Sequence, residues 1–149
     1  MKKIEYNGET IEAYSLIMRK ENALEILRGE KTVEIRSLSS RYEKMFTDYA
    51  QLEKNESLRK QGRDDECQPI LRTDIGAIHF YSTGAPWTLD VEIDELGIGE
   101  VTPEGIKFLQ DEFGFHGLDY ALENLEDVTE PDLFYYLHIS RVLGHSGLD

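Results

Sequence analysis

Side chains able to do chemistry are concentrated in one short segment, residues 29–36 (GEKTVEIR). Its second half alternates polar and apolar residues, so Glu34 and Arg36 share one strand face with Thr32. A carboxylate beside a guanidinium can form an ion pair, or can offer an acceptor and a forked donor to a planar ligand. Lys31, at the turn before the strand, can anchor a phosphate or act as a base.

The same residues have a purely structural interpretation, which spacing alone favours. As a surface ion pair, Glu34 and Arg36 would contribute about 0–1 kcal/mol to stability. A recognition site predicts that Arg36→Ala costs less than about 1 kcal/mol in folding but about 1.5–3 kcal/mol in ligand binding. A pair buried against the next helix predicts instead a loss of several kcal/mol in stability.

The pattern around this segment predicts a strand, a helix and a second strand. Residues 13–18 (AYSLIM) form an apolar run typical of a buried strand. Residues 20–28 (KENALEILR) have a helical pattern that Gly29 should end in the left-handed conformation. Residues 31–36 then form the second strand.

The next part of the chain, about 40–72, is interpreted as an insertion. Ser40 and Glu43 have the spacing of a capping box and predict a helix that reaches Leu52. Residues 53–70 are polar and charged, and we expect the frayed end of that helix followed by a mobile loop, which should be the most mobile internal segment and the first site of tryptic cleavage.

The remaining pattern predicts a sheet with flanking helices. The expected elements are a hairpin of strands 75–82 and 87–94, a helix from Pro103 capped by Thr102 and ended by Gly114, a short helix at 118–125, and a strand at 133–143. Leu89, Val91, Leu137 and Ile139 should share one core. We therefore expect a single α+β domain over residues 1–149, a small and mostly antiparallel β-barrel with flanking helices.

Charge is distributed unevenly along the 149 residues, whose formal net charge is −14. Residues 1–72 carry 14 basic and 14 acidic side chains, whereas residues 73–149 carry two basic and 16 acidic ones. The second half would repel a long polyanion, so we expect no binding of long duplex DNA. A nucleic acid or nucleotide would have to approach the first half.

Other classes of protein are disfavoured by what the sequence lacks. One cysteine cannot form an internal disulfide, which favours a reducing, cytoplasmic location. Without a long apolar run we expect no signal peptide and no membrane span. Common metal and nucleophile motifs are missing as well, so we expect neither a metal nor a cofactor.

The motif G-x-K-x-x-E-x-R, formed by Gly29, Lys31, Glu34 and Arg36, resembles the signature of the ASCH domain, a family of the PUA-like superfamily of small β-barrels. The specific resemblance covers Tyr14–Arg36. Elsewhere it is architectural: the strand that ends in Ser82 is similar to the central barrel strand of the family, and the last strand is similar to the closing one. The insertion at 40–72 departs from the compact family pattern.

This resemblance implies binding of RNA or nucleotides in a cleft between the barrel and the first helix. Some ASCH proteins are ribonucleases, and a related branch hydrolyses N4-acetylated cytidine with a lysine, a threonine nucleophile and a glutamate. Lys31 matches that lysine, but Glu34 stands where the threonine would be. The match to this branch is therefore broken, although Thr32, two residues away on the same strand face, is not excluded as the nucleophile.

We therefore expect a base or a short single-stranded RNA to bind in this cleft. Lys31 and Arg36 would contact phosphate or carbonyl oxygens, Glu34 would accept from an exocyclic amine, and Tyr81 would stack on the base. The predicted ligand-binding residues are Lys31, Thr32, Glu34, Arg36, Tyr81 and Ser82. One alternative is an amidohydrolase or ribonuclease with Lys31 and Glu34 as catalytic residues and Thr32 as a third candidate. The other is an acidic interaction protein that binds a basic partner.

Overall fold

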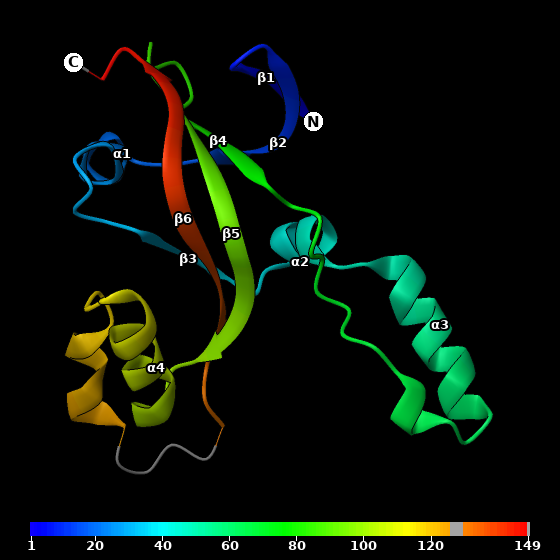
Figure 1. Ribbon diagram of the computed structural model, residues 1–149. Helices are drawn as coiled ribbons and strands as arrows, with labels where there is room; N and C mark the ends of the chain where they lie inside the picture. The colour runs from blue at the N-terminus through cyan, green and yellow to red at the C-terminus, as the bar shows by residue number, and fades with distance from the viewer. Residues whose placement is uncertain (126–129, 149) are drawn as a thin grey trace.

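A computed structural model describes residues 1–125 and 130–148 of the chain. It shows an α+β structure built around one six-stranded sheet (Figure 1). Neighbouring strands follow the order β1-β2-β4-β5-β6-β3, and every neighbouring pair is antiparallel except β2 and β4. The strands are β1 (Lys2–Tyr6), β2 (Glu9–Ile17), β3 (Val33–Ser37), β4 (Ala77–Tyr81), β5 (Thr88–Glu100) and β6 (Leu133–Ser146).

The helices begin and end largely where local signals place them. They are α1 (Lys20–Leu27), α2 (Ser40–Phe46), α3 (Tyr49–Lys60) and α4 (Pro103–Phe113), with short 3-10 helices η1 (Asp64–Glu66) and η2 (Asp119–Asn124). The Thr102 side chain accepts a hydrogen bond from the Gly105 amide at 3.0 Å and caps α4, as predicted. Gly114 and Gly29 adopt positive φ values of 63° and 77° just after α4 and α1. Within the described residues, no helix is both long and apolar enough to cross a membrane.

The sheet is open, so the predicted closed barrel is not confirmed. Strands β1 and β3 are its two edges. To close the sheet, β3 would have to pair with the strands at the other side, β1 or β2. Within the described residues, β3 pairs with neither of them. The end of β2 and strand β3 instead face each other across a hollow that side chains line from both sides.

Apolar side chains pack on both faces of the long β5–β6 pair. Leu89, Val91, Leu137 and Ile139 belong to one buried cluster, which confirms the prediction that they share a core. On the opposite face, α4 covers a second cluster that includes Val33 of β3. Strand β3 therefore has its apolar side chains under α4 and its polar ones toward the other face.

The first strand and its turn were not anticipated from the sequence. Strands β1 and β2 form a hairpin around Asn7 and Gly8, whose φ values are 50° and 80°. Asn-Gly is the typical dipeptide of a two-residue hairpin turn, so a signal was present. The last strand also extends beyond the predicted residue 143, because residues up to Ser146 pair with β5.

The segment between β3 and β4 corrects two predictions. The helix expected from Ser40 to Leu52 is interrupted at Thr47 and Asp48, where Asp48 caps α3 by accepting from the Gln51 amide at 3.0 Å. The frayed helix end predicted at the start of 53–70 is instead regular helix, because α3 runs to Lys60.

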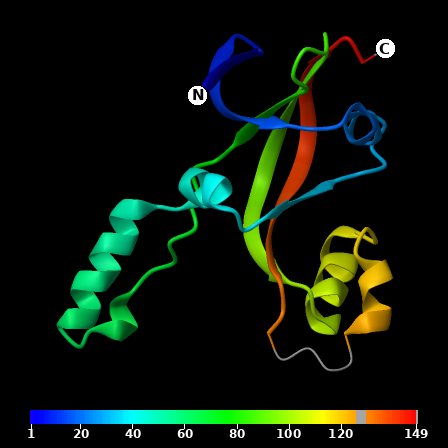
Figure 2. The same ribbon diagram turned by 180° about the vertical axis from the view of Figure 1, so that it is seen from behind.

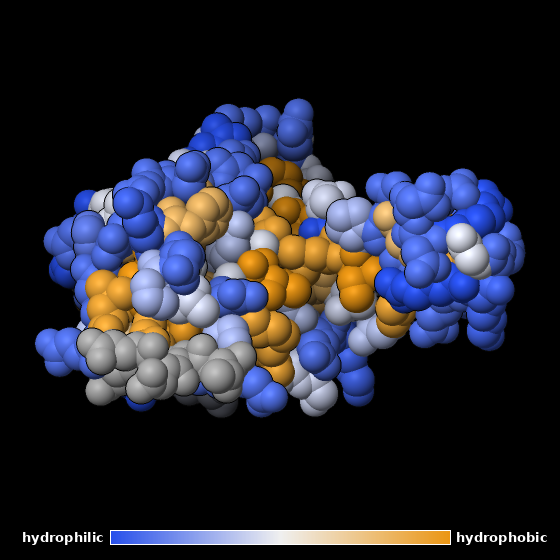
Figure 3. Space-filling view, turned by 90° about the horizontal axis from the view of Figure 1, so that it is seen from below, coloured by the Kyte–Doolittle hydropathy of each residue, from blue (hydrophilic) through white to orange (hydrophobic). Residues whose placement is uncertain are grey.

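The helix α3 and the returning chain form an arm that projects away from the sheet (Figures 1 and 2). Asn55, only 2% exposed, ties the two together: its Nδ2 donates to the Gln68 carbonyl at 2.7 Å, and its Oδ1 accepts from the Gln68 amide at 3.0 Å. Seen from below, the arm is almost wholly hydrophilic, and apolar side chains gather between it and the body (Figure 3). A helix without an apolar face has no amphipathic period to detect, which explains why the pattern did not predict a regular helix beyond Leu52.

Candidate functional site

The predicted motif places a buried carboxylate on the edge strand β3. The side chain of Glu34 is only 8% exposed. Its Oε1 lies 3.6 Å from Lys31 Nζ, and its Oε2 lies 3.7 Å from Arg36 Nη2. Glu34 thus stands between two cations, which lowers the cost of burying its charge.

Arg36 is held in place by aromatic side chains. Its side chain is 13% exposed, and Nη1 donates to the Tyr42 hydroxyl of α2 at 2.9 Å. The guanidinium carbon also lies 5.7 Å from the centre of the Tyr42 ring and 6.0 Å from that of Phe80. The pair with Glu34 is therefore not a surface ion pair, and the low folding cost expected of Arg36→Ala loses its basis.

Two buried polar atoms of this pair lack hydrogen-bond partners among the described residues. They are Glu34 Oε2 and Arg36 Nε. The other carboxylate oxygen, Oε1, accepts from the Ile35 amide at 3.2 Å. An unpartnered buried polar atom is costly, and a folded protein that retains one often does so for function.

A first hollow, of about 670 Å³, lies beside Lys31 and is called the Lys31 hollow here. Its walls come from α1, from the start of β3 and from the 114–120 segment that follows α4. Figures 1 and 2 show α1 and β3 next to each other, with α4 and η2 below β3. Lys31, Thr32 and Glu34 line this hollow together.

A second hollow, of about 460 Å³, lies at the open edge between β2 and β3 and is called the Arg36 hollow. Arg36 lines it together with Arg19, the residue before α1, and Ser82, the residue after β4. Asn22 and Glu34 line both hollows. The two hollows therefore adjoin, with Glu34 in the wall that they share, and the pair of hollows is called the cleft.

The structure brings five of the six predicted ligand-binding residues to this cleft. Tyr81 is the exception, because it lines neither hollow and instead stacks on His79, with ring centres 6.1 Å apart. Several lining residues were not anticipated, above all Arg19, Tyr42 and Tyr120. Tyr42 lies in the helix predicted from Ser40, where no local pattern marks it as a site residue, and the same is true of Tyr120.

The 114–120 segment is held by the carboxylate of Asp119. Gln110 Nε2 of α4 donates to Asp119 Oδ1 at 2.7 Å, and His116 Nδ1 lies 2.9 Å from Oδ2. The hydrogen bond from Gln110, followed by that from His116, lowers the pKa of Asp119. This wall of the Lys31 hollow is thus tied to α4 by an ionised carboxylate.

No three histidine, cysteine or carboxylate side chains converge as metal ligands within residues 1–125 and 130–148. Comparisons with protein-family models, with curated proteins and with solved structures gave no significant match. The functional interpretation therefore depends on the cleft itself and on the motif that lines it.

Proposed function

We propose that this protein binds a nucleotide or the end of a short single-stranded RNA in the cleft around Glu34, as an ASCH-type protein with a PUA-like fold. The motif of Lys31, Glu34 and Arg36 supports the family assignment. In this proposal Glu34 accepts a hydrogen bond from a donor on the base, and the neighbouring cations contact carbonyl or phosphate oxygens.

The observation that carries this proposal is the Oε2 atom of the buried Glu34 carboxylate. Among the described residues it has no hydrogen-bond donor, and the Glu34 side chain lies in the wall that both hollows share. A ligand N–H reaching this oxygen would supply the missing donor. Amino and imino groups of nucleobases are donors of this kind.

The charge of the molecule favours a small ligand over a long one. Residues 73–149, which carry the whole of the acidic surplus, include all of β4, β5 and β6. A long duplex would have to run along this acidic surface, whereas a single nucleotide would meet only the cleft.

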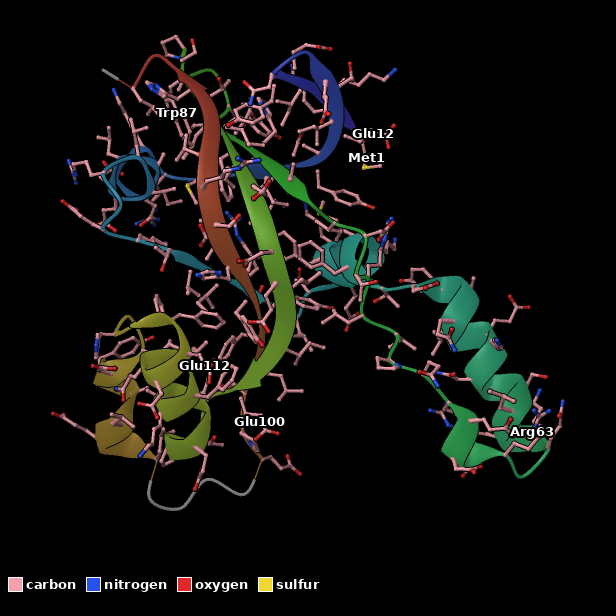
Figure 4. All side chains as sticks on the ribbon, viewed as in Figure 1. Met1, Glu12, Arg63, Trp87, Glu100 and Glu112 are labelled. Carbon is pink, nitrogen blue, oxygen red and sulfur yellow. The ribbon has the colours of Figure 1, made fainter. Side chains whose placement is uncertain are left out.

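Isothermal titration with a panel of nucleosides, nucleoside monophosphates and short RNA oligonucleotides tests the proposal. We expect at least one base to bind, with Glu34→Gln weakening it more than tenfold because a charge-assisted hydrogen bond is lost. Glu12→Gln is the matched control, because Glu12 is exposed on the β1–β2 hairpin, away from the cleft (Figure 4).

Thermal unfolding of both variants must accompany the titrations, since Glu34 is buried. Tyr120→Ala provides a second perturbation that folding does not obscure, because this side chain is 75% exposed and lines the Lys31 hollow. The proposal is wrong if no member of the panel binds, or if folded Glu34→Gln and Tyr120→Ala proteins both bind as the wild type does.

A hydrolytic function is a second candidate, favoured by the 3.6 Å approach of Lys31 to Glu34 in a hollow that Thr32 also lines. In amide hydrolysis at this position, Glu34 would take a proton from water while the water oxygen bonds to the acyl carbon. The carbon–nitrogen bond would break, and Lys31 would protonate the departing nitrogen and recover its proton from Glu34.

An assay of N4-acetylcytidine hydrolysis, monitored by chromatography, distinguishes a hydrolytic function from binding alone. Hydrolysis predicts release of acetate that both Glu34→Gln and Lys31→Met abolish, with Glu12→Gln unaffected. Binding of the nucleoside without any product would exclude amide hydrolysis of this substrate.

A further inference from the structure

The two hollows of the cleft differ in the charge of the residues that line them. The Lys31 hollow has one lysine and three carboxylates, Glu25, Glu30 and Glu34. The Arg36 hollow has two arginines, Arg19 and Arg36, and a single carboxylate, that of Glu34 in the shared wall. An anionic group would therefore be repelled from the first hollow and attracted to the second.

Aromatic side chains are more numerous in the lining of the Lys31 hollow than in that of the Arg36 hollow. Phe115, His116 and Tyr120 line the Lys31 hollow, and Tyr120 is 75% exposed there. Base–aromatic stacking is worth about 1–3 kcal/mol per base, and it needs a ring face that solvent can reach. The Arg36 hollow has one aromatic residue in its lining, Tyr42, whose ring is already covered by Arg36 and Arg41.

Resting on the function proposed above, we infer that the ligand is a phosphorylated nucleotide held in one orientation. Its base lies in the Lys31 hollow against Tyr120, and its phosphate lies in the Arg36 hollow between Arg19 and Arg36. Glu34, in the shared wall, accepts from the base. The substrate class is then a nucleoside monophosphate or a phosphorylated RNA end, and a free nucleoside is a weaker ligand.

Further features of the Arg36 hollow suit a phosphate. Arg19 is exposed, so its guanidinium is free to reorient toward a ligand, whereas Arg36 is fixed by Tyr42. Ser37 and Ser82 add hydroxyl donors to the lining. The N-terminal end of α1, where helices carry a partial positive charge, has no side-chain cap and contributes Arg19 and Asn22 to this lining.

The test compares each nucleoside with its 5′-monophosphate by isothermal titration, using wild type, Arg19→Gln and Arg59→Gln. In the wild type we expect the monophosphate to bind at least tenfold more tightly, with this advantage shrinking as salt is raised. Arg19→Gln should weaken binding of the monophosphate about tenfold and leave the affinity for the nucleoside unchanged. Arg59→Gln is the matched control, because Arg59 is exposed on α3 in the projecting arm.

Two further titrants identify the source of the phosphate. A trinucleotide RNA with and without a 5′-phosphate reports an RNA end, and inorganic phosphate reports binding of an anion without a base. Preference for the phosphorylated trinucleotide over the monophosphate assigns the hollow to RNA ends, and the reverse assigns it to mononucleotides. Inorganic phosphate that binds as tightly as the monophosphate would overturn the inferred orientation.

The inference can fail while the proposed function stands. Equal binding of nucleoside and monophosphate, unaffected by Arg19→Gln, would overturn the inference and leave base recognition in place. Absence of binding by every nucleoside, monophosphate and oligonucleotide would instead overturn the proposed function and the inference with it.

Discussion

Replacing Arg36 by alanine would leave the Glu34 carboxylate buried with only part of its compensating charge. The two side chains are 8% and 13% exposed, so solvent screens their interaction little. Removing one partner of a buried ion pair costs about 3–5 kcal/mol. Because Lys31 remains 3.6 Å from Glu34, the lower end applies, about 3 kcal/mol. The lost hydrogen bond to Tyr42 adds about 1 kcal/mol.

Urea unfolding followed by tryptophan fluorescence measures this loss. Trp87 is the single tryptophan of the chain and is 3% exposed in the main core, so its emission reports opening of that core. The set of variants is Arg36→Ala, Glu34→Gln and the double variant. We expect the double variant to be clearly less destabilised than the sum of the two single ones, because it leaves neither Glu34 nor Arg36 buried without the other.

An Arg36→Ala protein within about 1 kcal/mol of wild type would refute this reasoning, as would strictly additive effects in the cycle. Since breaking the pair affects folding, loss of stability at Arg36 does not by itself separate a binding site from a structural pair. Exposed residues of the cleft, Arg19 and Tyr120, are therefore better probes of binding.

Three more outcomes are expected. Asn55→Ala should speed tryptic cleavage of the α3 arm, because Asn55 joins α3 to Gln68, and should leave the midpoint of thermal unfolding of the core unchanged. An unchanged rate of cleavage would show that Asn55 does not hold the arm together. Gly97→Ala should destabilise the fold by about 1–3 kcal/mol in urea unfolding, because the added Cβ would lie 2.3 Å from the Tyr136 ring; a neutral effect would show that the ring moves freely. Burial raises the pKa of Tyr135 and of Tyr136 above the ordinary 10.0. The tyrosines of the unfolded chain therefore ionise first, and the free energy of unfolding should fall as pH rises above 10. A variant with both tyrosines replaced by Phe whose free energy of unfolding falls equally steeply above pH 10 would refute this.

Local signals determined most elements of the fold and the residues of the motif. The alternation in 87–94 predicts β5 because a strand with one buried face needs an apolar residue at every second position. Thr102 and Gly114 mark the ends of α4 because capping depends on a few neighbouring atoms. Two-residue spacing likewise puts Glu34 and Arg36 on one face of β3.

Only the tertiary structure decided what these residues face. The pair is buried because Tyr42 of the inserted α2 covers Arg36, a contact that no periodicity encodes. The sheet stays open because β3 pairs only with β6, leaving the Arg36 hollow between β3 and the end of β2. The Lys31 hollow likewise needs the 114–120 segment, which lies far from the motif in sequence. Local pattern reports which face of an element is apolar, whereas a cleft depends on which distant surfaces meet and on how completely their side chains fill the space between them.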